Sequence, residues 1–100
     1  MSTYVVAPDA EDDLLNVWRY YAEETNDPDL ADRVSNEFVS AFRSLARSPG
    51  IGHLRHDLSE EPLRFWSVRR YLVIYREMSG RIEIVRILHS ARDVQAILNG

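Results

Sequence analysis

The sequence contains no cysteine and no lysine, and each absence excludes a kind of chemistry. Without cysteine, the chain forms neither a disulfide framework nor a thiolate metal site. Without lysine, any mechanism that needs a side-chain amine is closed to it. All twelve basic residues are arginine, which suits bidentate contacts with carboxylates and phosphates. A GC-rich genome explains this bias, so arginine usage by itself assigns no ligand.

Long apolar runs are also missing. No run approaches the roughly 20 residues that a membrane-spanning helix needs, and the N-terminus has no basic region followed by an apolar core. We therefore expect no signal peptide and no membrane partner, and a cytoplasmic protein. The 100 residues predict a single domain, residues 1–100, with enough apolar residues (45%) for one core.

Charge is distributed unevenly between the two halves of the chain. Residues 1–50 hold ten acidic residues and four arginines, a net charge of −6. Residues 51–100 hold six acidic residues and eight arginines, a net charge of +2. The second half is therefore the candidate docking surface for an acidic partner. The alternative is that the acidic residues of the first half are simply the solvated faces of helices.

A stretch in the second half, residues 64–93, is dense in β-branched and aromatic residues, a composition typical of strands. Two short breaks, at Arg69-Arg70 and at residues 78–80, divide it into three runs. Connections this short permit only antiparallel pairing, so the sequence predicts a three-stranded meander over residues 63–89.

The last of these runs, residues 81–89, has no cleanly polar face. Strict alternation of side chains predicts two sets, with Ile82, Ile84, Arg86 and Leu88 on one face and Glu83, Val85, Ile87 and His89 on the other. Both sets contain large apolar residues. We therefore expect helices to cover one face of the sheet, and either the C-terminal segment or a partner to cover the other.

Two amphipathic helices are predicted before the meander. Apolar residues at spacings of three and four predict a helix over residues 9–24. A second helix is expected to begin at Pro28, with Asp27 as its N-cap, and to end at residues 48–50. The short connection between the two helices predicts an antiparallel hairpin.

Three shorter segments complete the chain. Residues 3–7 are β-prone and predict a strand that pairs with the meander. The apolar residues of 49–62 show neither helical nor strand periodicity, and the segment contains two prolines and two glycines, which predicts a loop. Leu54 and Leu58 are expected to anchor this loop by packing against the domain. Residues 94–98 have the spacing of a last helical turn. The order predicts an α+β domain with a helical hairpin packed on an antiparallel sheet.

Four aromatic residues are expected to be structural. Trp18 and Trp66 are predicted to anchor the core and not to serve as stacking platforms. Tyr71 and Tyr75 are predicted to pack beneath the helices with their hydroxyls near the rim.

Several short motifs occur in the order of a known family. They are Pro8-x-Ala10-x-x-Asp13-Leu14, Tyr20-Tyr21, Leu45-Ala46-x-x-Pro49-x-x-Gly52, Tyr71-x-x-x-Tyr75 and Ile84-x-Arg86-x-Leu88-His89-x-x-Arg92-Asp93. Their combined order and spacing resemble the ParE branch of the RelE/ParE superfamily, the toxins of type II toxin–antitoxin and plasmid stabilisation systems. The resemblance covers nearly the whole chain, and it implies the RelE/ParE-like α+β fold.

The resemblance also implies partners. A cognate antitoxin would wrap the toxin with its C-terminal segment, and operator DNA would be contacted only through the antitoxin. ParE-like toxins are implied to poison DNA gyrase. We expect an antitoxin helix in a groove and an added strand at a sheet edge, on a surface formed by the basic meander half and the tail. The expected partner-binding residues are Arg69, Arg70, Arg86, His89, Arg92 and Asp93.

RelE-like toxins instead cut mRNA, which requires a base, an acid and positive charge on the phosphate. The resemblance implies that this branch uses strand lysines, an arginine after the tyrosine that opens the second meander strand, an arginine past the last strand, and a C-terminal tyrosine. Here Leu72 follows Tyr71, and only Arg92 is retained. The sequence therefore predicts a binding toxin that is not an enzyme, with no catalytic residues and no cofactor.

Two alternatives to this prediction stay open. His89 and Arg92 would be catalytic in an mRNA endonuclease, in which Arg70 and either Glu60 or Glu61 complete the site. The alternative explanation of His89, as a strand-end residue hydrogen-bonded to nearby backbone, is the one that the sequence favours. The other alternative is an inactive relic that binds its antitoxin and poisons nothing.

The other polar candidates have structural explanations as well. Asp93 would cap the terminal helix while Arg92 pairs internally, or both would meet a partner. His53 and His56 are spaced too closely for a metal pair and have no evident third ligand, so no metal site is predicted.

Overall fold

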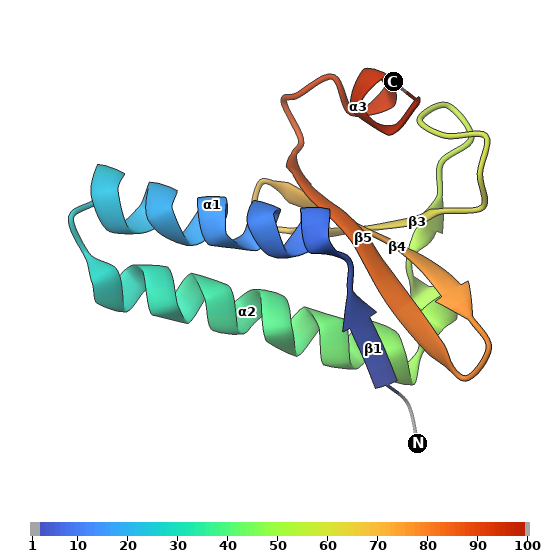
Figure 1. Cartoon of the computed structure of the whole chain (residues 1–100), viewed down its shortest axis with the longest axis horizontal. Coiled ribbons are helices and arrows are strands. Elements are labelled where there is room, and N and C mark those ends of the chain that lie inside the picture. Colours follow the sequence, from blue (N-terminus) through green and yellow to red (C-terminus); the bar gives the residue numbers. More distant parts are fainter. Residues whose placement is uncertain (1–2, 100) are drawn as a thin grey trace.

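The computed structural model describes residues 3–99, in which five strands form one sheet in the order β1-β5-β4-β3-β2. The elements are β1 (Thr3–Val6), α1 (Pro8–Glu24), α2 (Pro28–Arg47), a short 3-10 helix η1 (Pro49–Ile51), β2 (His53–Leu54), β3 (Arg64–Val68), β4 (Tyr71–Met78), β5 (Arg81–His89) and α3 (Val94–Asn99). Figure 1 shows α1 and α2 side by side as a hairpin, and α3 on the other side of the strands from α2. The α+β architecture predicted from the sequence is confirmed.

The two long helices begin where local chemistry favours them. Pro28 opens α2, and the Asp27 carboxylate accepts a hydrogen bond from the Leu30 amide at 3.1 Å, as an N-cap does. Pro8 opens α1, whose first turn carries acidic residues at the positive end of the helix dipole. Asn26 turns the chain between the helices with a positive φ of 52°. The predicted helix boundaries are confirmed to within one residue.

The meander is also confirmed, but the prediction of a wholly antiparallel sheet was wrong, because β1 joins it in parallel and makes the sheet mixed. β4 pairs antiparallel with both β3 and β5, through connections of two residues. β1 pairs with β5 in parallel, from Thr3 opposite Arg81 to Val6 opposite Ile84.

Within residues 3–99, no helix is both long and apolar enough to cross a membrane.

Strict alternation along β5 was wrong beyond Ile84. The pairing of β4 with β5 skips Val85, which forms a β-bulge. The phase of the side chains changes at this point: Ile87 joins Ile84 in the core beneath the helices, and Leu88 faces the opposite side. A one-residue insertion in the pairing leaves the composition of the strand unchanged, so the sequence pattern does not reveal it.

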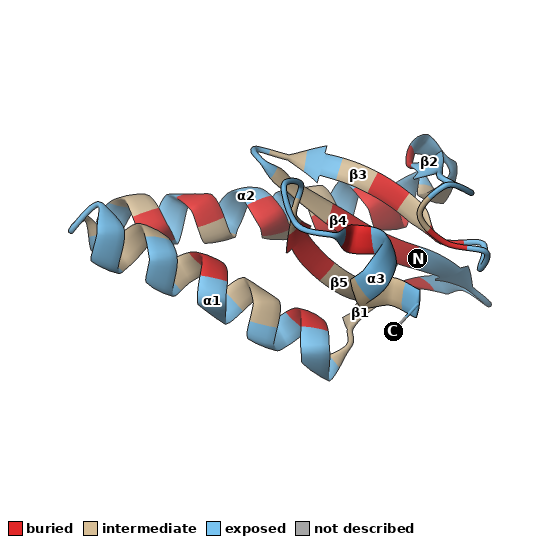
Figure 2. Ribbon diagram, turned by 90° about the horizontal axis from the view of Figure 1, so that it is seen from above, coloured by how far each residue is buried: buried red, intermediate tan, exposed pale blue. Residues whose placement is uncertain are grey.

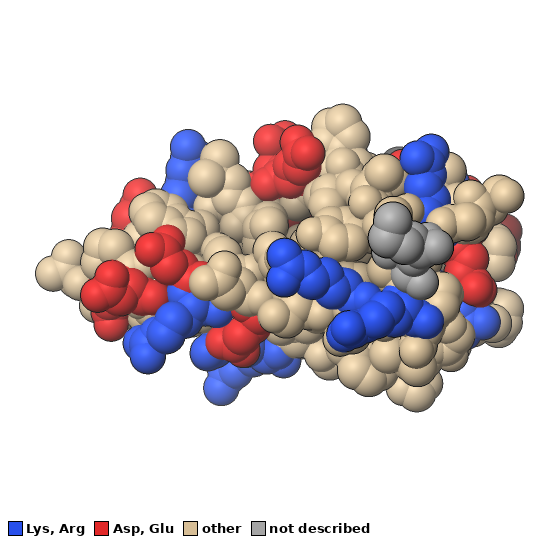
Figure 3. Space-filling view, turned by 90° about the horizontal axis from the view of Figure 1, so that it is seen from below, with Lys and Arg blue, Asp and Glu red and all other residues tan. Residues whose placement is uncertain are grey.

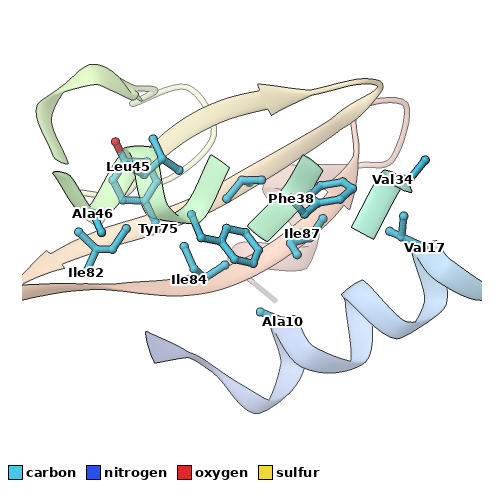
Figure 4. Close-up of a cluster of buried hydrophobic side chains, with 12 residues drawn as sticks. Ala10, Val17, Val34, Phe38, Leu45, Ala46, Tyr75, Ile82, Ile84 and Ile87 are labelled. Carbon is cyan, nitrogen blue, oxygen red and sulfur yellow. The ribbon is translucent and has the colours of Figure 1, made fainter. Parts of the chain in front are cut away.

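The sheet has a core on each face. The main core lies between the sheet and the α1–α2 hairpin and includes Phe38, Leu45 and Ile84 (Figure 4). The second core includes Phe65 and Leu88, and residues of α3 and the 55–63 segment pack on it. The burial pattern in Figure 2 follows these layers, with buried positions along the inner side of α2 and the central strands. The C-terminal segment therefore covers the second face, one of the two coverings expected.

The connection from α2 to β3 is more ordered than the loop predicted for residues 49–62, because Tyr75 holds it. The Tyr75 side chain is fully buried, and its hydroxyl donates to the Pro49 carbonyl at 2.6 Å and accepts from the Gly52 amide at 2.9 Å. The prediction that the Tyr75 hydroxyl lies near the rim was therefore wrong. Burial raises the pKa of Tyr75. Leu54, expected to hold this segment, is 44% exposed.

Gly52→Ala is expected to destabilise the fold. A Cβ at this position would lie 2.3 Å from the Tyr75 hydroxyl oxygen and 2.7 Å from its ring. Displacing a fully buried tyrosine costs about 1–3 kcal/mol, which lowers the melting temperature by roughly 4–8 °C for each kcal/mol in a domain of this size. Thermal unfolding followed by circular dichroism measures this effect.

Gly50→Ala is the matched control, because a Cβ there meets nothing within 4 Å. Equal melting temperatures for the two variants would show that the Tyr75–Gly52 contact does not constrain the fold.

Candidate partner-binding site

Four of the six expected partner-binding residues lie at one end of the sheet. Arg69 and Arg70 form the turn between β3 and β4, and Tyr71, the next residue, pairs with His89 at the end of β5. The Ser90 amide donates to the Arg70 carbonyl at 2.8 Å, and the Arg92 amide donates to the His89 carbonyl at 3.0 Å. We refer to Arg69, Arg70, His89 and Arg92 as the basic end.

The arginines of the basic end differ in whether another side chain of the protein pairs with them. Arg69 forms an ion pair with Glu37 of α2 at 2.7 Å, and its guanidinium lies 5.7 Å from the centre of the Tyr21 ring. The hydrogen bond to Glu37 raises the pKa of Arg69. Arg70 and Arg92 are exposed, and among residues 3–99 neither takes part in an ion pair. At the basic end, the positive charge available to a partner therefore comes mainly from Arg70 and Arg92.

His89 has the contacts of a strand-end residue. Its Nδ1 accepts a hydrogen bond from the Ala91 amide at 3.1 Å, and its ring meets the Tyr71 ring edge to face at 5.3 Å. Glu60 and Glu61, the candidate partners for a nuclease site, line a hollow with residues of α3, which neither His89 nor Arg70 lines. Among residues 3–99, the His89 side chain therefore contacts Ala91 and Tyr71, and Glu60 and Glu61 line a different part of the surface.

Asp93 also makes a hydrogen bond to nearby backbone. Its carboxylate accepts a hydrogen bond from the Ala96 amide at 3.1 Å, so it caps the start of α3. This contact agrees with the capping half of the structural interpretation, whereas the internal ion pair expected of Arg92 is not found among residues 3–99.

Arg86, the sixth expected residue, is bound to the first helix. Its guanidinium donates two hydrogen bonds to the Asp13 carboxylate, at 2.8 and 3.0 Å, and this contact raises the pKa of Arg86. Asp13 also accepts from the Ile87 amide at 2.9 Å. β1 ends opposite Ile84, so it offers no hydrogen-bond acceptor to Ile87 of β5. The Asp13 carboxylate supplies that acceptor instead. The pair lies 73 residues apart, and spacing along the chain gives no sign of it.

An apolar groove lies between β1, α1 and α2. It has a volume of about 660 Å³. Its lining residues are Tyr4, Val6, Glu11, Leu14, Leu15, Trp18, Ser35, Val39 and Phe42. Leu15 is 47% exposed, and the Trp18 indole donates from Nε1 to Asp32 across the two helices at 2.8 Å. Sequence reasoning missed this groove, because helical spacing alone assigned its residues to the core.

The groove and the basic end are separate features. None of the six expected residues lines the groove, and all of its lining residues belong to the acidic first half of the chain. The surface expected from the meander half and the tail therefore supplies charge, and the first half supplies the apolar opening.

The arrangement is that of a small α+β protein with an open apolar groove beside its sheet. Its fold is shared with a chain of the chromosomal ParDE TA system from P. aeruginosa, with a TM-score of 0.73 and 22% identity over 89% of this chain and 96% of that chain. The family model described as the ParE toxin of the type II toxin–antitoxin system, parDE, matches residues 4–94. The chain therefore belongs to the ParE toxin family. Among curated proteins, none has a sequence that matches it.

Asp13→Ala is expected to destabilise the protein by about 2–3 kcal/mol. The change leaves the Ile87 amide and the Arg86 guanidinium without their shared acceptor, and the Asp13 side chain is only 11% exposed. Urea unfolding gives the free energy. Asp12→Ala is the matched control, because Asp12 is an exposed neighbour on the same helix. A similar loss in both variants would contradict the role assigned to Asp13.

Proposed function

We propose that this ParE toxin acts in the cytoplasm by binding DNA gyrase and that a cognate antitoxin neutralises it. Membership of the ParE toxin family supports both partners as a class. The observation that carries the proposal is the open groove between β1, α1 and α2, because apolar openings of this kind in small proteins mark sites where partners bind.

The groove suits an amphipathic antitoxin segment. Its lining is mostly apolar, with Glu11 and Ser35 as the polar members, and Trp18 and Leu15 offer large side chains to a partner. Aromatic and aliphatic side chains in such a groove commonly supply most of the binding free energy. A helix that places residues at spacings of three and four into the groove would bury this surface.

The basic end gives the protein a second set of contacts. Arg70 and Arg92 are exposed and would meet carboxylates of the antitoxin or of gyrase, with Arg69 beside them. Arg86, His89 and Asp93 would contribute by holding this end in shape, since each makes contacts within the chain. Contacts of this type affect partner choice and association rate more than affinity.

In this proposal the toxin inhibits its target by binding to it and does not cleave RNA. A ribonuclease of the RelE type needs several proton-transfer and phosphate-binding groups together. This chain has no lysine and has Leu72 after Tyr71, and its His89 Nδ1 is engaged with backbone. These observations support a toxin that inhibits its target by occupying it.

Purified toxin is expected to inhibit negative supercoiling by gyrase and to raise the amount of cleaved DNA trapped in the assay. His89→Ala is expected to inhibit as well as the unchanged toxin, because His89 performs no chemistry. Primer extension on translated mRNA provides the parallel measurement and should show no cuts. Transcripts that are cut by the toxin and left intact by His89→Ala would contradict the proposal. Antitoxin binding without an effect on gyrase or mRNA would indicate the inactive relic.

Leu15→Glu is expected to weaken antitoxin binding at least about tenfold, because it places a charge in the apolar groove. The side chain is 47% exposed, so the fold should tolerate the change. Ile51→Glu is the matched control, since Ile51 is 40% exposed and lies outside the groove. Isothermal titration with the antitoxin encoded beside the toxin gene gives the affinities. Equal affinities for the two variants would place the antitoxin elsewhere.

A further inference from the structure

The second half of α2 presents only arginine and serine side chains to solvent. Between residues 40 and 48, the exposed positions are Ser40, Arg43, Ser44, Arg47 and Ser48. No acidic residue occurs among residues 38–56, although the chain as a whole has a net charge of −4. Arginine only donates hydrogen bonds, and a serine hydroxyl can donate as well. This face therefore suits a partner that presents repeated acceptors, and it lacks the apolar side chains that form the centre of a protein–protein interface.

Arg81, the first residue of β5, extends this face beyond the helix. Arg43 and Arg47 line a hollow of about 440 Å³, and Arg47 and Arg81 line a neighbouring hollow of about 320 Å³. Arg47 therefore adjoins both of the other arginines. We refer to Arg43, Arg47 and Arg81 as the arginine row. Figure 3 views the side of the molecule on which α2 lies and shows adjacent arginine side chains there, without an acidic side chain between them.

The arginine row is not neutralised within the part of the chain that the structure describes. All three side chains are exposed, and none takes part in an ion pair among residues 3–99. Glu77 lines the hollow of Arg47 and Arg81, but it pairs with Arg64 at 3.3 Å. Arg47 lies in the last turn of α2, where its charge also stabilises the helix dipole. That explanation does not extend to Arg43 or Arg81.

The arginine row is distinct from the groove and from the basic end. None of its members lines the groove. Arg81 begins β5 and His89 ends it, so the row and the basic end lie at opposite ends of this strand, roughly 25 Å apart. The contacts proposed above for the antitoxin and for gyrase therefore do not use the row.

We propose that the arginine row binds the phosphate backbone of duplex DNA held by the target enzyme. The inference rests on the proposed function, because gyrase brings duplex DNA next to a bound toxin. This DNA is the substrate of gyrase and not the operator that the antitoxin contacts. Duplex DNA carries a negative charge about every 1.7 Å along its axis, and arginine forms bidentate contacts with phosphate. Serine hydroxyls beside the arginines supply further donors of the kind that position a protein on DNA without reading its sequence.

Fluorescence anisotropy with short labelled duplexes, measured over a range of salt concentrations, tests the contact. The unchanged toxin should bind duplexes of unrelated sequence equally well. The logarithm of its affinity should fall with the logarithm of salt concentration with a slope of about −2.7, as three phosphate contacts require. Arg43→Ala, Arg47→Ala and Arg81→Ala should each make this slope shallower by about 0.9.

Arg33→Ala is the matched control, because it removes an exposed arginine from the first half of the same helix and should leave the slope unchanged. Absence of binding at low salt, or equal slopes for the control and the three row variants, would overturn the proposal. It is also overturned if the row variants lose affinity for the antitoxin and keep their affinity for DNA, since the row would then belong to the antitoxin site.

A supercoiling assay separates this inference from the proposed function. Arg43→Glu should require several-fold more toxin for half inhibition of gyrase than Arg33→Glu, an equal change of charge away from the row. A toxin that inhibits gyrase and binds no DNA overturns the DNA contact and keeps the proposed function. A toxin that binds DNA through the row and leaves gyrase active supports the contact and overturns the proposed function.

Discussion

The contact between Asp13 and β5 sets the layout of this protein. One carboxylate accepts from the Arg86 guanidinium and from the Ile87 amide, and so joins the first helix to the edge of the last strand. α1 therefore takes the place that a longer β1 would have filled. Because β1 stops at Val6, the sheet keeps a short open edge next to the helices, and the groove lies at this junction.

Each face of the sheet is stabilised by its own hydrophobic core. The helical hairpin covers one face, and α3 with the segment before β3 packs on the other, so each face of the sheet carries a core. Tyr75 joins the layers, because its ring lies in the main core while its hydroxyl fixes the chain at Gly52. What stays open is the groove at the side of the sheet. This is the geometry expected of a protein that functions through a partner.

Much of the charge that appeared free in the sequence is used within the fold. Arg86 and Arg69 bind Asp13 and Glu37, and Asp93 caps α3. Positive charge without an internal partner occurs at the basic end and along the C-terminal half of α2. The acidic first half of the chain therefore contributes arginines to the groove side, which its net charge of −6 concealed.

The sequence by itself determined the three helices, the N-terminal strand, the meander and the family, but not η1 and β2. Apolar spacing, Asp27-Pro28 and the short breaks in the meander specify helices and turns through local sterics and hydrogen bonds. Only the tertiary structure decided the bulge at Val85, the burial of the Tyr75 hydroxyl and the groove beside β1. Each of these depends on how segments far apart in the chain pair and pack, and residue spacing carries no record of that pairing.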